Sequence, residues 1–264
     1  MILRLAIGAA LATIIAALAV RMRLLSATGA VAAVVIGAAA VAAGWSWGIL
    51  LVVFFVLTSA VSAYGSERKR ALTLGILAKG GTPRDADQVL SNGEVFAAAG
   101  MIWLATGDPL FLAAGGGAIA AAAADSWATE TGIALGGIPR SIISWTPMTR
   151  GTSGGVTIAG FAGALAGAAA MAGTMLLVGW PRAVAVAAFF AGVLGMIVDS
   201  VLGATLQARQ FCAACGTETE QLVHHCGRPT QLIHGVRWMG NDLVNLLATL
   251  SGAVIAGILL VATA

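Results

Sequence analysis

Residues 120–157 read AAAAADSWATETGIALGGIPRSIISWTPMTRGTSGGVT and join an alanine-rich apolar stretch to a short polar loop. The apolar part carries two carboxylates, Asp125 and Glu130, and the loop carries Arg150 ahead of a run of small residues. A carboxylate within a membrane helix costs about 2.5–3.5 kcal/mol on insertion scales, so such a group is usually retained for a function. Backbone N–H groups of a glycine-rich loop bind anions well. The stretch therefore predicts carboxylates that hold a metal beside a loop that holds phosphates.

The composition of the whole chain is that of a membrane protein. Of its 264 residues 59% are hydrophobic and only 9% are charged, whereas soluble domains carry about 25% charged residues. No charge occurs from Leu24 to Ser66 or from Gly151 to Pro181, and each of these stretches is long enough for two spans. The 35 glycines and the abundant alanine favour closely packed helices over a β-barrel. We expect an all-α polytopic membrane protein, and the composition offers no basis for binding nucleic acid.

The apolar segments predict about eight membrane-spanning helices, and six or seven are also compatible with the pattern. We place them near residues 3–20, 25–44, 47–64, 87–106, 110–134, 155–179, 183–206 and 240–263. The first segment resembles a signal peptide, but Arg21 and Arg23 follow it without a polar cleavage region, so we interpret it as a retained span. Trp45, Trp47 and Trp180 fall in turns between spans, as interfacial anchors do.

Lysine and arginine are concentrated in the connections on one side of these spans. The positive-inside rule then places three loops in the cytoplasm and both termini outside. We expect one integral-membrane domain, 1–264, in the cytoplasmic membrane. Its cytoplasmic loops are predicted at 65–86, at 136–154, which is rich in glycine, and at 207–237, which holds a Cys/His cluster. An active site built on these loops faces the cytoplasm.

Polar residues of several predicted spans gather in the cytoplasmic half, whereas the outer half is nearly bare. Asp125 and Asp199 lie within their spans, about ten and about seven residues from the inner ends, and Asp242 begins the last span. Mg²⁺ prefers one or a few carboxylates together with substrate phosphates. We expect these three aspartates to bind Mg²⁺ and, with Glu130, to be catalytic. Two alternatives stay open, namely acids paired with arginine and acids that form the ion path of a transporter.

Phosphoryl transfer depends mainly on positioning and on neutralising negative charge. The candidate nucleotide- or phosphate-binding residues are Lys79, Arg84, Asp85, Asn92, Ser126, Arg150, Gly151, Ser153, Gly154, Ser200, Gln207, Asn241 and Asn245. The run after Arg150 lacks GxxxxGKS or GxxxxGKT, so it is not a Walker loop. Its glycines also fit plain helix packing, and Asn241 and Asn245 also fit hydrogen bonds between helices.

The predicted loop at 207–237 contains all three cysteines, in the pattern C-x2-C-x8-H-H-C. This spacing suits a tetrahedral zinc site of three thiolates and one imidazole, and a cytoplasmic loop disfavours a disulfide. We expect a structural Zn²⁺ held by Cys212, Cys215, His225 and Cys226, because no catalytic acid accompanies the cluster.

Three segments resemble a widespread integral-membrane family, namely Arg84–Gly93 (RDADQVLSNG), Ala124–Glu130 (ADSWATE) and Arg150–Thr157 (RGTSGGVT). Asp199–Gln207 and Asn241–Asn245 continue the resemblance, which covers most of the chain in order. The family was long classed as a domain of unknown function and includes the chloroplast phytyl-phosphate kinase of vitamin E salvage. It is distantly similar to dolichol kinases and phosphatidate cytidylyltransferases, which also use CTP at a membrane carboxylate site.

The resemblance implies an isoprenoid monophosphate kinase, in which a nucleoside triphosphate, CTP, donates a phosphoryl group to a lipid such as phytyl phosphate. The implied cofactor is Mg²⁺, and the implied partners are CTP, a prenyl-phosphate lipid and the membrane, with a homo-oligomer left open. The cysteine-rich segment lies outside the core pattern of the family. The alternatives are a lipid-phosphate cytidylyltransferase, an isoprenoid alcohol kinase and, from another class, an ion-coupled transporter.

Overall fold

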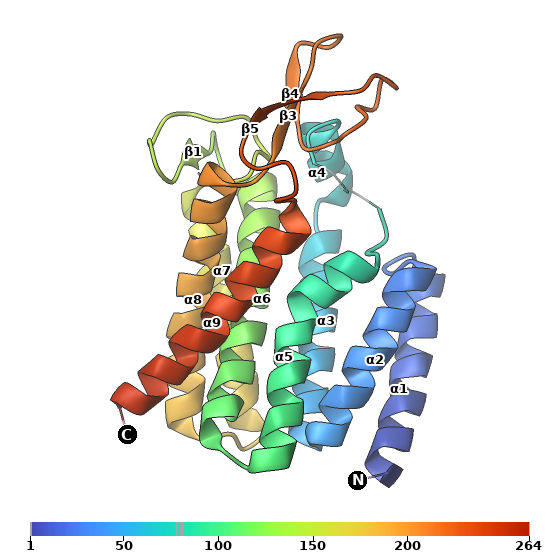
Figure 1. Cartoon of the computed structure of the whole chain (residues 1–264), viewed down its shortest axis with the longest axis vertical. Coiled ribbons are helices and arrows are strands. Elements are labelled where there is room, and N and C mark those ends of the chain that lie inside the picture. Colours follow the sequence, from blue (N-terminus) through green and yellow to red (C-terminus); the bar gives the residue numbers. More distant parts are fainter. Residues whose placement is uncertain (1, 78, 80–81, 264) are drawn as a thin grey trace.

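Long helices lie side by side through most of the molecule, and short strands gather at one end (Figure 1). The computed structural model describes residues 2–77, 79 and 82–263, so residues 78, 80 and 81 of the first predicted loop lie outside the described part. The long helices are α1 (Ile2–Arg21), α2 (Ala27–Ala43), α3 (Trp45–Ala63), α5 (Ala86–Thr106), α6 (Pro109–Leu135), α7 (Ile158–Leu177), α8 (Arg182–Thr205) and α9 (Asn241–Ala262).

Each predicted span corresponds to one of these helices. Within the described residues, seven helices are long and apolar enough to cross a membrane, and α2 is apolar but has only 17 residues. The prediction of an all-α polytopic membrane protein is confirmed. The strands add small antiparallel sheets that the sequence did not indicate.

The connections with the most polar residues emerge at the same end of the bundle, and both termini lie at the opposite end (Figure 1). Besides the short helix α4 (Ser66–Thr73), this loop end holds the pair β1 (Arg140–Ser141) and β2 (Gly155–Val156). It also holds a sheet in the order β4–β3–β5, formed by β3 (Arg209–Cys212), β4 (Thr217–Thr219) and β5 (Gln231–His234). The cytoplasmic placement of this end stays a prediction.

Side chains at the helix starts explain where several helices begin. Asp85 and Gln88 form a capping box at α5, in which the side chain of each residue accepts a hydrogen bond from the backbone N–H of the other. Asp108 accepts a hydrogen bond from the backbone N–H of Leu110, and Pro109 occupies the first turn of α6. Thr157 caps α7 in the same manner. Each cap satisfies N–H groups that would otherwise lack a partner.

Helix α6 lies at the centre and packs against α3, α5, α7, α8 and α9. Its residues 118–124 are almost completely buried, and they are alanine and isoleucine. A Cβ atom on Gly117 would lie 2.2 Å from the backbone oxygen of Gly252, so α6 and α9 touch through their backbones. Many large side chains of α1, α3 and α8, among them Ile14, Val52 and Phe190, face outward instead. Small residues inside and large ones outside are typical of helices that pack within a bilayer.

Two of the three tryptophans predicted as interfacial anchors lie in the core. Trp47 is fully buried and Trp180 is 6% exposed, whereas Trp45 is 48% exposed, as an anchor would be. The ring of Trp47 lies 4.9 Å from those of Phe96 and Trp180. A Cβ on Gly115 would lie 2.4 Å from the Trp47 ring. Because glycine has no side chain, α6 leaves at this position the space that the indole fills.

The contact between Gly117 and Gly252 predicts the effect of a single methyl group. Gly117→Ala must push α6 away from α9, which we expect to cost about 1–3 kcal/mol or more. Gly173→Ala on α7 is the matched control, because a Cβ there meets nothing within 4 Å. The control should be neutral or stabilising by up to about 1 kcal/mol. Thermal unfolding in detergent measures both variants, and equal melting temperatures would contradict the close packing.

Candidate functional site

Two carboxylates face each other between packed helices near the loop end. Asp125 on α6 and Asp199 on α8 have side chains within hydrogen-bonding reach of one another. The Oδ2 atom of Asp199 is buried and has no hydrogen-bond partner among the described residues. Among the described residues, no ion pair or hydrogen bond joins a basic side chain to either aspartate. Two adjacent carboxyl groups without a cationic partner are suited to a divalent cation.

A third polar residue lies at the level of this pair. A Cβ on Gly195 would lie 2.6 Å from Ala121 Cβ and 3.1 Å from the backbone oxygen of Ala248, so α6, α8 and α9 meet there. The two aspartates follow Ala121 and Gly195 by one helical turn toward the loop end. Helix α9 runs in the opposite direction, so its residues one turn closer to the loops are Val244 and Asn245 (Figure 1). The register therefore brings a carboxamide to the level of the two carboxylates.

The loops add a carboxylate that the sequence analysis missed. Glu220 accepts hydrogen bonds from Ser153 Oγ at 2.5 Å and from Gln207 Nε2 at 3.0 Å, and its charge acts on Asp199. Ser153 and Gln207 were both predicted to bind phosphate. Glu220 carries no motif and lies 13 residues after Gln207 in a loop, so only the fold reveals their proximity.

The glycine-rich loop packs on the end of α8. Gly154 has a φ of +81°, and a Cβ there would lie 2.5 Å from backbone atoms of Ala204. A Cβ on Gly151 would lie 2.9 Å from Thr73 Cγ2. Both glycines thus serve close packing, which is the alternative that the sequence left open. Arg150 makes no hydrogen bond or ion pair with any other described residue, so its guanidinium is available to a ligand.

Asp242, predicted to share the metal with Asp125 and Asp199, has a lysine as its partner. Lys79 Nζ lies 2.7 Å from Asp242 Oδ2 and 2.8 Å from Asp85 Oδ2, so it joins the starts of α9 and α5. Burial by itself lowers the pKa of Lys79, but the hydrogen bonds to Asp242 and Asp85 outweigh it and raise the pKa above the ordinary value. The pKa of Asp85 is lowered, because hydrogen bonds from Lys79 and from the backbone of Gln88 outweigh burial. The shared lysine offsets part of the negative charge of the two aspartates and holds two helix ends together.

Glu130, predicted to be catalytic, is also held by a lysine. Lys69 of α4 forms an ion pair with Glu130, and it also donates to the backbone oxygens of Val61 and Ser62 at 3.2 and 2.7 Å. Ser62 Oγ donates to the other carboxylate oxygen at 2.6 Å, and Arg84 Nη2 lies 3.4 Å from the same hydroxyl. The side chain of Lys69 is only 8% exposed. Glu130 therefore fastens α4 to the bundle.

The remaining predicted residues have local partners or none among the described residues. Asn92 Nδ2 donates to the backbone oxygen of Gln88 at 2.9 Å, and Ser200 Oγ contacts Met196 Sδ at 3.8 Å. The side chains of Ser126, Asn241 and Asn245 make no hydrogen bond within the described part of the chain.

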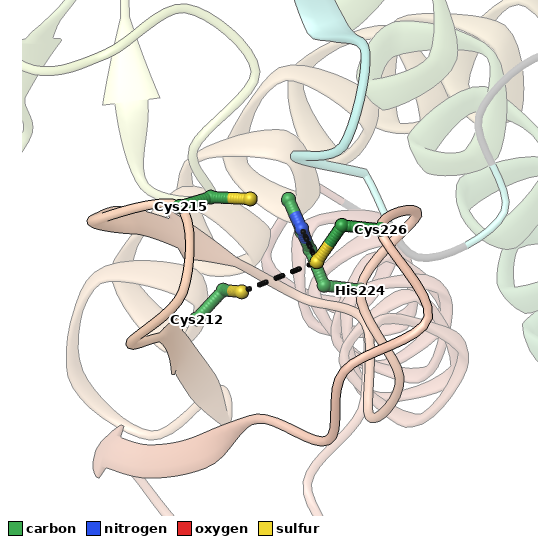
Figure 2. Close-up of side chains that lie close together, drawn as sticks. All are labelled: Cys212, Cys215, His224 and Cys226. Carbon is green, nitrogen blue, oxygen red and sulfur yellow. Dashed lines mark hydrogen bonds between the residues drawn. The ribbon is translucent and has the colours of Figure 1, made fainter.

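Three cysteines and one histidine converge between the strands of the loop end (Figure 2). One ligand atom from each of Cys212, Cys215, His224 and Cys226 lies within 4.8 Å of the others. His224 takes the place that we expected for His225. His224 is buried with its Nδ1 3.3 Å from Cys226 Sγ, whereas the adjacent His225 packs its ring against that of His224, at 4.0 Å between ring centroids, and stays exposed.

Two hollows lie beside the helices that carry these residues. An apolar cavity of about 100 Å³ between α1, α2, α3 and α5 has Arg84, Gln88 and Asn92 among its lining residues. An open groove of about 400 Å³ between α5 and α9 is lined in part by Asp87 and Asp242. The first hollow suits hydrocarbon with a polar group at one end, and the second is acidic.

The fold and the site define an integral membrane protein of many spans with a carboxylate-rich polar site at one end of its helical bundle. The chain belongs to the family described as integral membrane protein DUF92, whose model matches residues 10–253.

Similarity to known proteins extends over most of the chain. It is 29% identical to Protein PGR of Arabidopsis thaliana, in an alignment that covers 94% of this chain and 93% of that protein. It is 26% identical to the uncharacterized membrane protein MJ0933 of Methanocaldococcus jannaschii, over 83% of this chain and 78% of the relative. No solved structure matches the chain.

The ion pair of Lys69 with Glu130 predicts a structural effect of Glu130→Gln. Removing one partner of a fully buried pair costs about 3–5 kcal/mol. Glu130 is 26% exposed and Lys69 keeps two carbonyl acceptors, so we expect a loss at or below the lower end of that range. Lys69→Met combined with Glu130→Gln should cost less than the sum of the single changes. Thermal unfolding of the wild type, the two single variants and the double variant in detergent gives the coupling free energy between the two side chains. A Glu130→Gln variant of normal stability that has lost its activity would instead support a catalytic role.

Proposed function

We propose that this protein is a CTP-dependent kinase that phosphorylates an isoprenoid monophosphate, such as phytyl phosphate, to the diphosphate. The observation that carries the proposal is the pair Asp125 and Asp199, which face each other without a basic partner among the described residues. In this respect they differ from Glu130 and Asp242, which each form an ion pair with a lysine.

A divalent cation fits the residues at this position. The buried Oδ2 atom of Asp199 has no hydrogen-bond partner among the described residues, and two facing carboxyl groups are unfavourable unless a proton or a cation joins them. Asp125 and Asp199 would hold Mg²⁺, and Asn245 lies at their level. When bound, Mg²⁺ supplies positive charge that offsets the charge of the substrate phosphates.

The reaction requires little covalent chemistry from the protein. An oxygen of the lipid phosphate attacks the γ-phosphorus of CTP, the bond from that phosphorus to the bridging oxygen breaks, and CDP leaves with the bond's electrons. The attacking group is already an anion, so no strong general base is required. Arg150 lies in the turn that packs on the end of α8, and its free guanidinium is suited to a bidentate contact with phosphate oxygens. The residues act by positioning and by charge.

The apolar cavity supports a lipid as the acceptor. Its walls come from α1, α2, α3 and α5, and Arg84, Gln88 and Asn92 line its polar part. Because the cavity lies among helices that cross the membrane, hydrocarbon reaches it from the bilayer and a phosphate group stays near Arg84. We propose that part of the isoprenoid chain occupies this cavity.

The loop end is the proposed cytoplasmic end, because lysine and arginine are concentrated there. Nucleotide and Mg²⁺ then arrive from the cytoplasm, while the lipid arrives laterally. A transporter gains no support, because the half of the bundle near the termini is filled by the aromatic group around Trp47. A cytidylyltransferase would use the same carboxylates, so the position of the label decides between the two enzymes.

The decisive assay uses purified protein, phytyl phosphate, Mg²⁺ and CTP labelled at the γ-phosphorus. Label should appear in the lipid, and label in pyrophosphate would identify a cytidylyltransferase instead. Asp125→Asn and Asp199→Asn should each lower turnover by about a hundredfold or more, because charge stabilisation is lost. Asp108→Asn is the matched control, since Asn caps a helix as well as Asp does and Asp108 begins α6 at the opposite end from the loops. Normal turnover in both site variants would contradict the proposal.

A second experiment tests the lipid cavity. Ala33 lines it, whereas Val35 on the same helix is 62% exposed. Ala33→Trp should raise KM for phytyl phosphate about tenfold, since each 1.4 kcal/mol of lost binding is a factor of ten, with little change in KM for CTP. Val35→Trp should leave both values near normal. Equal KM values for the lipid in the two variants would place the chain elsewhere.

A further inference from the structure

Two distances among Cys212, His224 and Cys226 match a tetrahedral metal site, and the sulfur of Cys215 lies within 4.8 Å of the other three ligand atoms. Cys212 Sγ lies 3.7 Å from Cys226 Sγ, and His224 Nδ1 lies 3.3 Å from the same sulfur. A tetrahedral zinc with Zn–S of about 2.3 Å and Zn–N of about 2.0–2.1 Å separates two sulfurs by about 3.8 Å and a sulfur from a nitrogen by about 3.5 Å. All four ligand atoms lie within 4.8 Å of one another, close enough to converge on one ion (Figure 2).

Two tight turns bring the ligands together. In the first, the backbone N–H of Gly216 donates to the oxygen of Cys212 at 2.8 Å. In the second, the N–H of Gly227 donates to the oxygen of His224, also at 2.8 Å. Both glycines have positive φ, +66° and +80°, which other residues adopt only with strain. The first turn presents Cys212 and Cys215, and the second presents His224 and Cys226.

The donor set selects the kind of metal. Three thiolates and one imidazole suit zinc and exclude Mg²⁺ or Ca²⁺, which take oxygen ligands. The sulfurs of Cys212 and Cys226 are too far apart for a disulfide, and all three cysteines are free. The other ring nitrogen of His224, Nε2, faces the loop after α4, where a Cβ on Gly75 would lie 2.9 Å from it. This leaves Nδ1 as the coordinating atom.

We propose that Cys212, Cys215, His224 and Cys226 bind one structural Zn²⁺ that holds together the loop module of β3, β4 and β5. Four protein ligands close the coordination sphere, which is typical of structural rather than catalytic zinc.

The module that the zinc holds carries Glu220 to the polar site. Thr219 ends β4, and the next residue, Glu220, donates its backbone N–H to the oxygen of Ile76 at 2.7 Å. Gln221 Nε2 donates to the oxygen of Leu77 at 3.0 Å. The side chain of Glu220 accepts from Ser153 and Gln207. Zinc at one end of β4 therefore sets the position of a carboxylate near Asp199. The importance of this position for activity rests on the proposed kinase function, whereas the zinc site itself does not.

Metal analysis of the purified full-length protein tests the site without any assay of activity. The wild type should contain about one equivalent of zinc. His224→Ala and Cys226→Ser should lose it, whereas His225→Ala, at the adjacent exposed position, should keep it. Zinc retained in His224→Ala and lost in His225→Ala would assign the imidazole ligand to the other histidine and overturn this set.

A measurement on the wild-type protein tests the site even if the variants fail to fold. The thiols should react slowly with a thiol reagent, and a strong chelator should make them react fast while it increases proteolysis within residues 206–240. Wild-type protein without zinc after growth and purification with added zinc, or with a disulfide between any two cysteines, would refute the site. Zinc binding together with an inactive kinase assay would leave the site standing and reject only the proposed function.

Discussion

The close approach of α6 to α8 and α9 is the constraint on which the site depends. Gly117 meets Gly252 backbone to backbone, and Gly195 meets Ala121. Helices reach this separation only where the side chains between them are a hydrogen atom or a methyl group. The aspartate side chain is short, so Asp125 and Asp199 face each other only because their helices are this close. The alanine and glycine content of the chain is thus the condition for a polar site inside an apolar bundle.

Partners divide the acidic residues into two groups. Glu130 and Asp242 each have a lysine, and these ion pairs hold α4 to α6 and the start of α9 to that of α5. Asp125 and Asp199 have each other and no basic side chain among the described residues. A charge that is already paired contributes to anchoring, whereas an unpaired carboxylate inside a bundle is unfavourable unless a ligand or proton joins it. The second group therefore carries the chemistry that we propose.

The loops complete the site at the loop end of the helical bundle. The glycine-rich loop packs on the end of α8, and the sheet of β3, β4 and β5 brings Glu220 to Ser153 and Gln207. These segments are far apart along the chain, and the hydrogen bonds of residues 219–221 to Ile76 and Leu77 connect them to the loop after α4. The proposed zinc reinforces a module that is too small to bury a core of its own.

The sequence by itself determined the membrane class, the positions of the long helices and the gathering of polar residues toward one end of the bundle. Apolar length and charge asymmetry act along the chain and need no knowledge of contacts. Only the tertiary structure decided which acid meets which partner, that Trp47 fills the core, and that His224 rather than His225 joins the cysteines. A step of one residue turns a side chain by about 100° on a helix, and in the turn from His224 to Gly227 it separates a buried histidine from an exposed one. Partners are therefore set by how segments rotate and cross, which residue spacing alone does not specify.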